Sequence, residues 1–151
     1  MKNIIRLSFL AVLSVGILAS CAKKDSTNNN PPAFVSSMST TLNGTAWTAA
    51  TVSGVANSGT IDISGTSSNS TQMLITMPST ATPGTYTPSL GGNYDVLYTM
   101  TSTDIYYISS GSLVVTSNSG GVVVGTFQGT MTDANSNSIT CTGGAFNVKY
   151  Q

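Results

Sequence analysis

The fold is decided by residues 38–47, MSTTLNGTAW. Met38, Thr40 and Leu42 fall at every second position, which is the period of side chains on one face of a β-strand. Asn43-Gly44 follows at once, and this pair is the strongest two-residue signal for the turn of a β-hairpin. The stretch therefore predicts an antiparallel hairpin.

The same alternation recurs along the rest of the chain, with turn residues at close intervals and no helical period after residue 21. Strands are expected at 46–52, 61–63, 73–77, 94–100, 105–108, 113–116, 122–132 and 138–150. Short connections favour antiparallel pairing of neighbouring strands. The prediction is a single all-β domain over residues 34–151, either an antiparallel β-sandwich or a small open β-barrel of about eight or nine strands.

The expected final hairpin changes the parity of its apolar positions at glycine in both strands, near Gly125 in the first and at Gly143-Gly144 in the second. Side chains alternate with a strict period of two, so a change of parity requires an inserted residue or a sharp bend. A turn centred on Asn135 would place the two glycine regions roughly opposite each other. This predicts a shared bulge or bend, and the alternative is that half of each strand is simply poorly patterned.

Side chains that could carry chemistry are scarce in this domain. From Phe34 onward there is one lysine and no arginine, histidine or glutamate, which argues against a nucleic-acid partner because phosphates need clustered cations. Without histidine, neither a Ser-His-Asp triad nor a zinc site of the usual kind can form. Cys141 lies in a strand pattern and is expected to be a buried, inert thiol. Strand alternation turns Asp62 and Asp95 outward, so we predict no catalytic site, metal or cofactor.

Two patterns remain as candidates for binding. Asp133, Asn135 and Asn137 match the first, third and fifth positions of a calcium loop, but Ser138 and Gly144 stand where that loop needs glycine and glutamate. An Asx-rich hairpin turn explains the same residues. The second pattern is aromatic: a stacking surface for sugars around Tyr94 and Tyr98. The alternative for the aromatic residues is a place in the core or at its rim, with Trp47 as a core anchor. The aromatic residues considered are Trp47, Tyr86, Tyr94, Tyr98, Tyr106 and Tyr107.

The first twenty residues have the three parts of an export signal. Lys2 and Arg6 precede an apolar run from Leu7 to Leu18, which is too short to span a membrane, and small residues follow it. Leu18-Ala19-Ser20-Cys21 resembles the lipobox of bacterial lipoproteins. The resemblance implies cleavage after Ser20 and acyl chains on Cys21, which anchor the protein to a membrane without spanning it.

Residues 22–33 have no hydrophobic period and are expected to form a solvated tether. The residue after Cys21 is alanine instead of the aspartate that retains lipoproteins in the inner membrane, so the outer membrane is the expected location. Asp25 stands alone where surface-exposed lipoproteins carry an acidic run, which leaves open whether the domain faces the periplasm or the outside. Asp25-Ser26-Thr27 also resembles an O-glycosylation motif, which implies modification of Ser26.

Short motifs across the domain resemble a group of small lipoproteins of unknown function common in the Bacteroidota. That group has a Leu-Asn-Gly-x-x-Trp start, an Ile-x-Ile-x-Gly strand, a Pro-Gly-Thr-Tyr turn and a closing Gly-Thr-Phe … Gly-x-Phe hairpin. The group brings no activity, and its resemblance adds only to the expected fold and location. The matching residues here are 42–47, 61–65, 83–86, 125–127 and 144–146.

Two functional hypotheses follow. The first is an acyl-anchored envelope protein whose β domain has a non-catalytic interaction or structural role, with an unknown envelope protein or glycan as its partner. The second is a module that binds a glycan or another small ligand through its aromatic residues.

Overall fold

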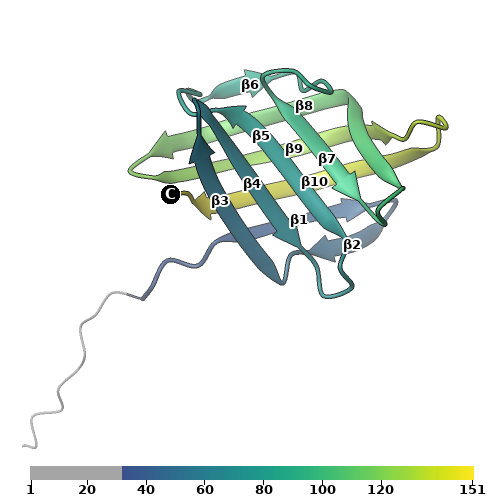
Figure 1. The fold of residues 1–151 in the computed structure, drawn as a ribbon, viewed down its shortest axis with the longest axis horizontal. Helices are drawn as coiled ribbons and strands as arrows, with labels where there is room; N and C mark the ends of the chain where they lie inside the picture. Colours follow the sequence, from purple (N-terminus) through teal and green to yellow (C-terminus); the bar gives the residue numbers. More distant parts are fainter. Residues whose placement is uncertain (1–31) are drawn as a thin grey trace, which may run out of the picture. The chain divides into compact units, whose positions relative to one another are not determined.

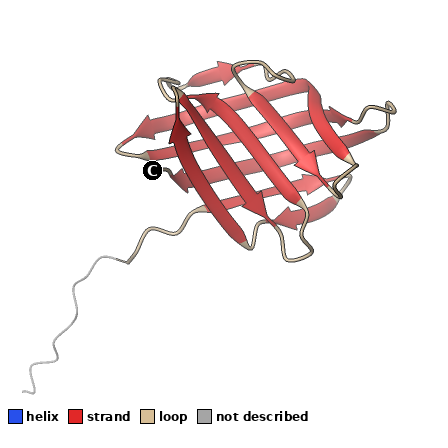
Figure 2. Ribbon diagram, in the orientation of Figure 1, coloured by secondary structure: helices blue, strands red, loops and turns tan. Residues whose placement is uncertain are grey.

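The structure is a computed structural model that describes residues 32–151. Ala33–Gln151 form a compact unit, in which every regular element is a strand (Figure 2). The strands are β1 (Ser37–Leu42), β2 (Thr45–Thr48), β3 (Thr51–Asn57), β4 (Thr60–Thr66), β5 (Gln72–Pro78), β6 (Gly84–Tyr86), β7 (Asp95–Thr99), β8 (Ile105–Ser119), β9 (Val122–Thr132) and β10 (Ser138–Lys149).

These strands form one antiparallel sheet in the order β2-β1-β10-β9-β8-β7-β5-β4-β3, and the short β6 pairs with β8 outside this path. The sheet curls, so that β3, β4, β5 and β7 cross in front of β8, β9 and β10 (Figure 1). The predicted all-β antiparallel class is confirmed, with ten strands in a curled sheet of the open-barrel kind.

The edge strand β3 approaches the end of the chain on the far side of the curl. The carbonyl oxygen of Gln151 accepts the N–H of Ala56 at 2.7 Å, and Tyr150 forms an isolated bridge with Gly54. These few bonds join the two sides of the sheet at one end of the barrel, whereas β2 pairs only with β1.

The core fills the concave side of the sheet and follows the period of two. In β4 and β5 the inward positions are fully buried, while the residues between them are half-buried or exposed. Trp47 is 7% exposed, which confirms its predicted place in the core. The largest fully buried side chains are Phe127, Met38, Ile61, Ile63, Met73, Ile75, Met77, Ile108, Leu113, Met131, Val96 and Val115.

Two predicted strand boundaries were wrong. Residues 46–52 do not form one strand, because the chain leaves β2 at Ala49-Ala50 and begins β3 on the other edge of the sheet. Residues 105–116 form one strand, β8, instead of two. The polar stretch around Gly111 stays paired with β9, since backbone hydrogen bonds do not depend on apolar side chains.

The predicted bulge is confirmed in β10 and wrong in β9. In β10 the pairing shifts between Cys141 and Gly144, and the buried positions change from odd to even there. In β9 the buried positions stay odd throughout, so Val123 points inward and the neighbouring valines lie on the outer side. Gly125 occupies an inward position without a side chain because the ring of Phe146 lies over it, which is why the apolar pattern seemed to change there.

Candidate ligand cavity at the barrel mouth

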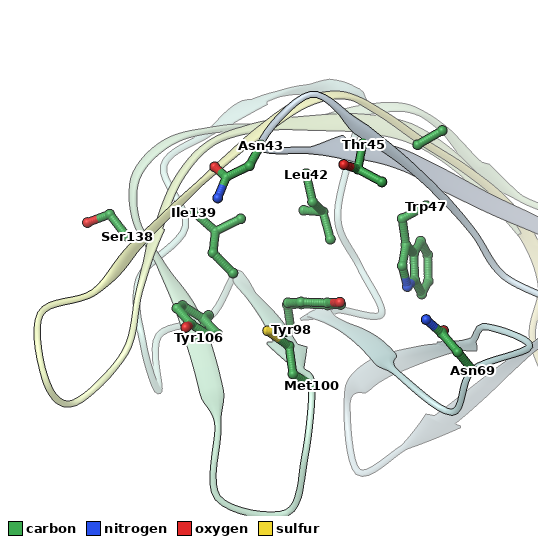
Figure 3. Close-up of a pocket in the computed structure, with 11 residues that line it drawn as sticks. Leu42, Asn43, Thr45, Trp47, Asn69, Tyr98, Met100, Tyr106, Ser138 and Ile139 are labelled. Carbon is green, nitrogen blue, oxygen red and sulfur yellow. The ribbon is translucent and has the colours of Figure 1, made fainter.

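One end of the barrel is open, and a cavity of about 400 Å³ lies in it. The connections β1–β2, β4–β5, β7–β8 and β9–β10 all reach this mouth. Figure 3 shows that these residues come from separate elements around one space, with the hydroxyl of Ser138 turned away from it. The residues that line it are Leu42, Asn43, Thr45, Ala46, Trp47, Asn69, Tyr98, Met100, Tyr106, Ser138 and Ile139.

The segment that follows β5 is held to the end of β8 that lies away from this mouth. The side-chain amide of Asn118 donates to the carbonyl oxygens of Ser79 and Ala81, each at 3.1 Å. The hydroxyl of Tyr150 in turn donates to Asn118 Oδ1 at 2.8 Å. The cavity lies at the other end of the barrel, and mouths of β-barrels are a common place for ligand sites.

The floor of the cavity is apolar and rigid. Leu42, Trp47, Tyr98 and Ile139 are all buried, and the rings of Trp47 and Tyr98 meet edge to face with 6.4 Å between their centroids. The indole N–H of Trp47 donates to the buried hydroxyl of Thr71 at 2.8 Å. This bond satisfies the polar atom of the indole and holds the ring in place.

Polar groups on the rim are oriented by bonds to the backbone and to neighbouring turns. Asn43 Oδ1 accepts the N–H of Thr140 at 2.8 Å, and Asn69 Oδ1 accepts the hydroxyl hydrogens of Ser67 and Thr71. These bonds fix the side-chain oxygens of Asn43 and Asn69. The NH₂ group of each side chain therefore points away from the turn that its oxygen contacts. In Figure 3 these nitrogens point toward the cavity.

Tyr98 contributes a hydroxyl group to the cavity. The residue is only 6% exposed, its ring lies among the floor residues, and its hydroxyl points into the open space (Figure 3). Within residues 32–151 this hydroxyl has no hydrogen-bond partner. Among the described residues, the buried side-chain atoms that lack a partner are Asp95 Oδ1 and Asn147 Oδ1, so the Tyr98 hydroxyl is accessible from the cavity and can bond to a ligand there.

The cavity carries no formal charge, since no lysine or aspartate lines it. Nowhere in residues 32–151 do three or more histidine, cysteine or acidic side chains come together in a way that could hold a metal ion. The lining is suited to a small uncharged molecule with both apolar and hydrogen-bonding parts.

Of the two tyrosines predicted to form a stacking surface for sugars, Tyr94 and Tyr98, only Tyr98 lines this cavity. Tyr98 lines the cavity, but Tyr94 stacks on Tyr86 elsewhere, with centroids 3.9 Å apart and planes at 14°. Burial raises the pKa of Tyr94 to about 12, helped by the adjoining Tyr86 hydroxyl. Tyr98 therefore lines this cavity without Tyr94, whose ring is stacked on Tyr86.

Sequence reasoning missed the polar rim and part of the floor. The sequence predicts only a turn at Asn43. It predicts no site role for Asn69, Met100, Ser138 or Ile139. All of these residues lie at or next to a connection between two strands, at the same end of the barrel. This shared position can be recognised only when the strand order is known.

The turn after β9 is explained by its own hydrogen bonds. Asp133 Oδ1 accepts the N–H groups of Asn135 and Asn137, and Oδ2 accepts the side-chain amide of Asn137 at 2.7 Å. These bonds, first of all the one from the Asn137 side chain, lower the pKa of Asp133. The arrangement is an Asx-rich turn, in which Asn137 donates to the carboxylate.

The remaining candidates for reactive groups are held in structural positions. Cys141 is buried, its Sγ lies 3.1 Å from the hydroxyl of Thr40, and burial raises the pKa of the thiol. Asp62 accepts a hydrogen bond from Thr76 at 2.8 Å. Asp95 is buried instead of exposed as predicted, because the loop before β7 covers it and the N–H of Gly91 donates to its carboxylate at 3.0 Å.

The predicted cleavage and modification sites, Ser20, Cys21 and Ser26, lie outside the described residues. Over residues 32–151 there is no helix of the length and apolar character needed to cross a membrane. Comparisons with protein-family models, curated proteins and solved structures find no match for the chain. The class of protein defined here is thus an all-β open barrel with a ligand-sized mouth, and the resemblance to Bacteroidota lipoproteins stays a prediction.

Proposed function

We propose that this protein is an acyl-anchored lipoprotein of the bacterial outer membrane whose β domain binds a small uncharged ligand in its mouth. The anchor rests on Leu18-Ala19-Ser20-Cys21 at the end of an apolar run. The binding role rests on a single observation, a cavity of about 400 Å³ at the barrel mouth into which the hydroxyl of Tyr98 points without a protein partner.

The geometry favours binding over a purely structural role. The Tyr98 hydroxyl points into the cavity, where it can both donate to and accept from a ligand, which a phenylalanine at this position could not do. A volume of about 400 Å³ also falls within the range of about 300–1,000 Å³ that is usual for small-molecule sites. An interaction role through another surface is the alternative that remains if no ligand enters the cavity.

The test is a thermal-shift screen of the full chain in detergent micelles. The probes are uncharged mono- and disaccharides, nucleosides and medium-chain alcohols. We expect at least one probe class to raise the melting temperature of the wild type in a dose-dependent way, and to raise that of Tyr98→Phe much less. Tyr107→Phe, on the neighbouring strand but outside the cavity, should respond like the wild type. Absence of stabilisation by every class would refute binding in the cavity.

A further inference from the structure

The chemistry of the cavity specifies the ligand more closely, on the condition that the proposed binding function holds. Its polar groups surround the opening instead of gathering at one point. Asn43 comes from the β1–β2 turn, Asn69 from the β4–β5 turn, and Tyr98 and Tyr106 from β7 and β8. We infer that the ligand is a neutral saccharide.

The type of these groups matches sugar hydroxyls. The NH₂ groups of Asn43 and Asn69 can only donate, whereas the hydroxyls of Tyr98 and Tyr106 can both donate and accept. A sugar ring carries hydroxyls in several directions, and each can accept from an amide and donate to a second oxygen. A long-chain alcohol has one polar end, so it could bond to only a few of the hydrogen-bonding groups on the rim.

The apolar surface of the cavity suits the carbon–hydrogen face of a sugar ring. Met100 is 46% exposed although it is a large hydrophobic residue, and it stands at the mouth beside Tyr98 (Figure 3). Tyr106 is half-buried on the same side. A ring inserted between Met100 and the floor residues would cover this apolar surface while its hydroxyls reach the rim.

The absence of charge in the lining separates neutral from acidic sugars. A uronic acid or a phosphorylated sugar would lose the hydration of its anion without meeting a cation, because no lysine lines the cavity. The site should therefore discriminate against anionic sugars of the same shape.

The experiment uses isothermal titration of the full chain in detergent micelles with neutral disaccharides, the matching uronic acids and n-octanol. Two variants, Asn43→Asp and Asn69→Asp, keep a side-chain oxygen that can hold each turn, replace the amide donor that faces the cavity with a second oxygen, and add one negative charge. We expect each to weaken saccharide binding about five- to tenfold, the effect of one lost hydrogen bond. Asn57→Asp is the matched control, since Asn57 accepts a bond from Ser58 at a turn outside the cavity.

The outcomes separate the two proposals. Binding of neutral disaccharides that weakens in both cavity variants and not in Asn57→Asp supports a saccharide site. Binding of n-octanol alone overturns the saccharide class and leaves a ligand-binding cavity. Saccharide binding that both cavity variants retain in full overturns this inference as well, because the sugar then sits elsewhere. If none of these probes binds and the thermal-shift screen also finds no ligand, the proposed function and the inference both fail; a nucleoside that alone stabilises the protein overturns only the inference.

Discussion

At the scale of residues, two glycines and two phenylalanines interlock across β9 and β10. Gly125 is paired with Phe146, and Gly144 is paired with Phe127. Each ring lies over the glycine of the opposite strand: a Cβ on Gly144 would come within 2.7 Å of Phe127 Cδ2, and one on Gly125 would collide with the Phe146 ring and with the backbone of Val114. The glycines are therefore required by the packing of the core.

Gly125→Ala and Gly144→Ala should each lower the free energy of unfolding by about 1–3 kcal/mol, the cost of overpacking a core. Urea unfolding followed by tryptophan fluorescence measures the change. Gly84→Ala is the control, because a Cβ there would meet only the Tyr86 ring at ordinary contact distance, 3.4 Å or more. Equal stability of Gly125→Ala and Gly84→Ala would contradict this account.

Thr71 has a separate role as the acceptor for the indole N–H of Trp47. Thr71→Val should cost about 1–3 kcal/mol, because the buried N–H loses its partner, and should shift the fluorescence of Trp47. Thr116→Val, at an exposed position on β8, should change stability by no more than about 0.5 kcal/mol. A Thr71 variant as stable as the Thr116 variant would show that the indole bond contributes little.

At the scale of elements, hairpin turns are stabilised by side chains that bond to the backbone. The β9–β10 turn depends on Asp133, whose charged carboxylate accepts three hydrogen bonds from Asn135 and Asn137. The β1–β2 turn depends on Asn43, which has φ of 47° and bonds to the backbone of Thr140. Asparagine adopts this left-handed conformation more readily than most residues.

The lowered pKa of Asp133 predicts the pH dependence of the turn. Its contribution is present above the unfolded pKa of about 3.9 and is lost as pH falls through the lower folded value. The wild type should therefore be more stable than Asp133→Asn near pH 7, and this difference should shrink below about pH 4. Chemical unfolding of both proteins from pH 7 to pH 2 tests this, and a difference that does not change with pH would contradict it.

At the scale of the whole molecule, the described chain enters the barrel far from the cavity. β1 runs from Ser37, where it pairs with Asn147, to Leu42, which lines the mouth. The hydroxyl of Ser36 accepts the N–H of Lys149 at 3.1 Å and holds this entry point beside the end of β10. Residues 33–36 therefore do not obstruct the mouth.

The lipid anchor can be tested by Cys21→Ala. This variant should move from the membrane fraction to the soluble fraction and should lose the label after growth with radioactive palmitate, because no thiol is left to acylate. Cys141→Ala is the control and should stay in the membrane fraction, since the Cys141 thiol is buried within the domain. Membrane association of Cys21→Ala would contradict the lipobox interpretation.

The sequence by itself determined the all-β class, most of the hairpins and the core position of Trp47. These features depend on period-two alternation and on turn residues such as Asn43-Gly44, which act between neighbours in the chain. The bulge near Gly143 was also predictable, because a change of parity in β10 is a local signal.

Only the tertiary structure decided how the sheet curls into an open barrel, the burial of Asp95 and the site at the mouth. The cavity needs Asn43, Asn69, Tyr98 and Ser138 on the same end of the barrel, and this depends on β1 pairing with β10, more than one hundred positions apart in the register of Thr41 and Thr142. Pairings between such distant segments leave no periodic trace in either one. The local pattern could therefore predict the strands, but not which of their ends would meet around a ligand.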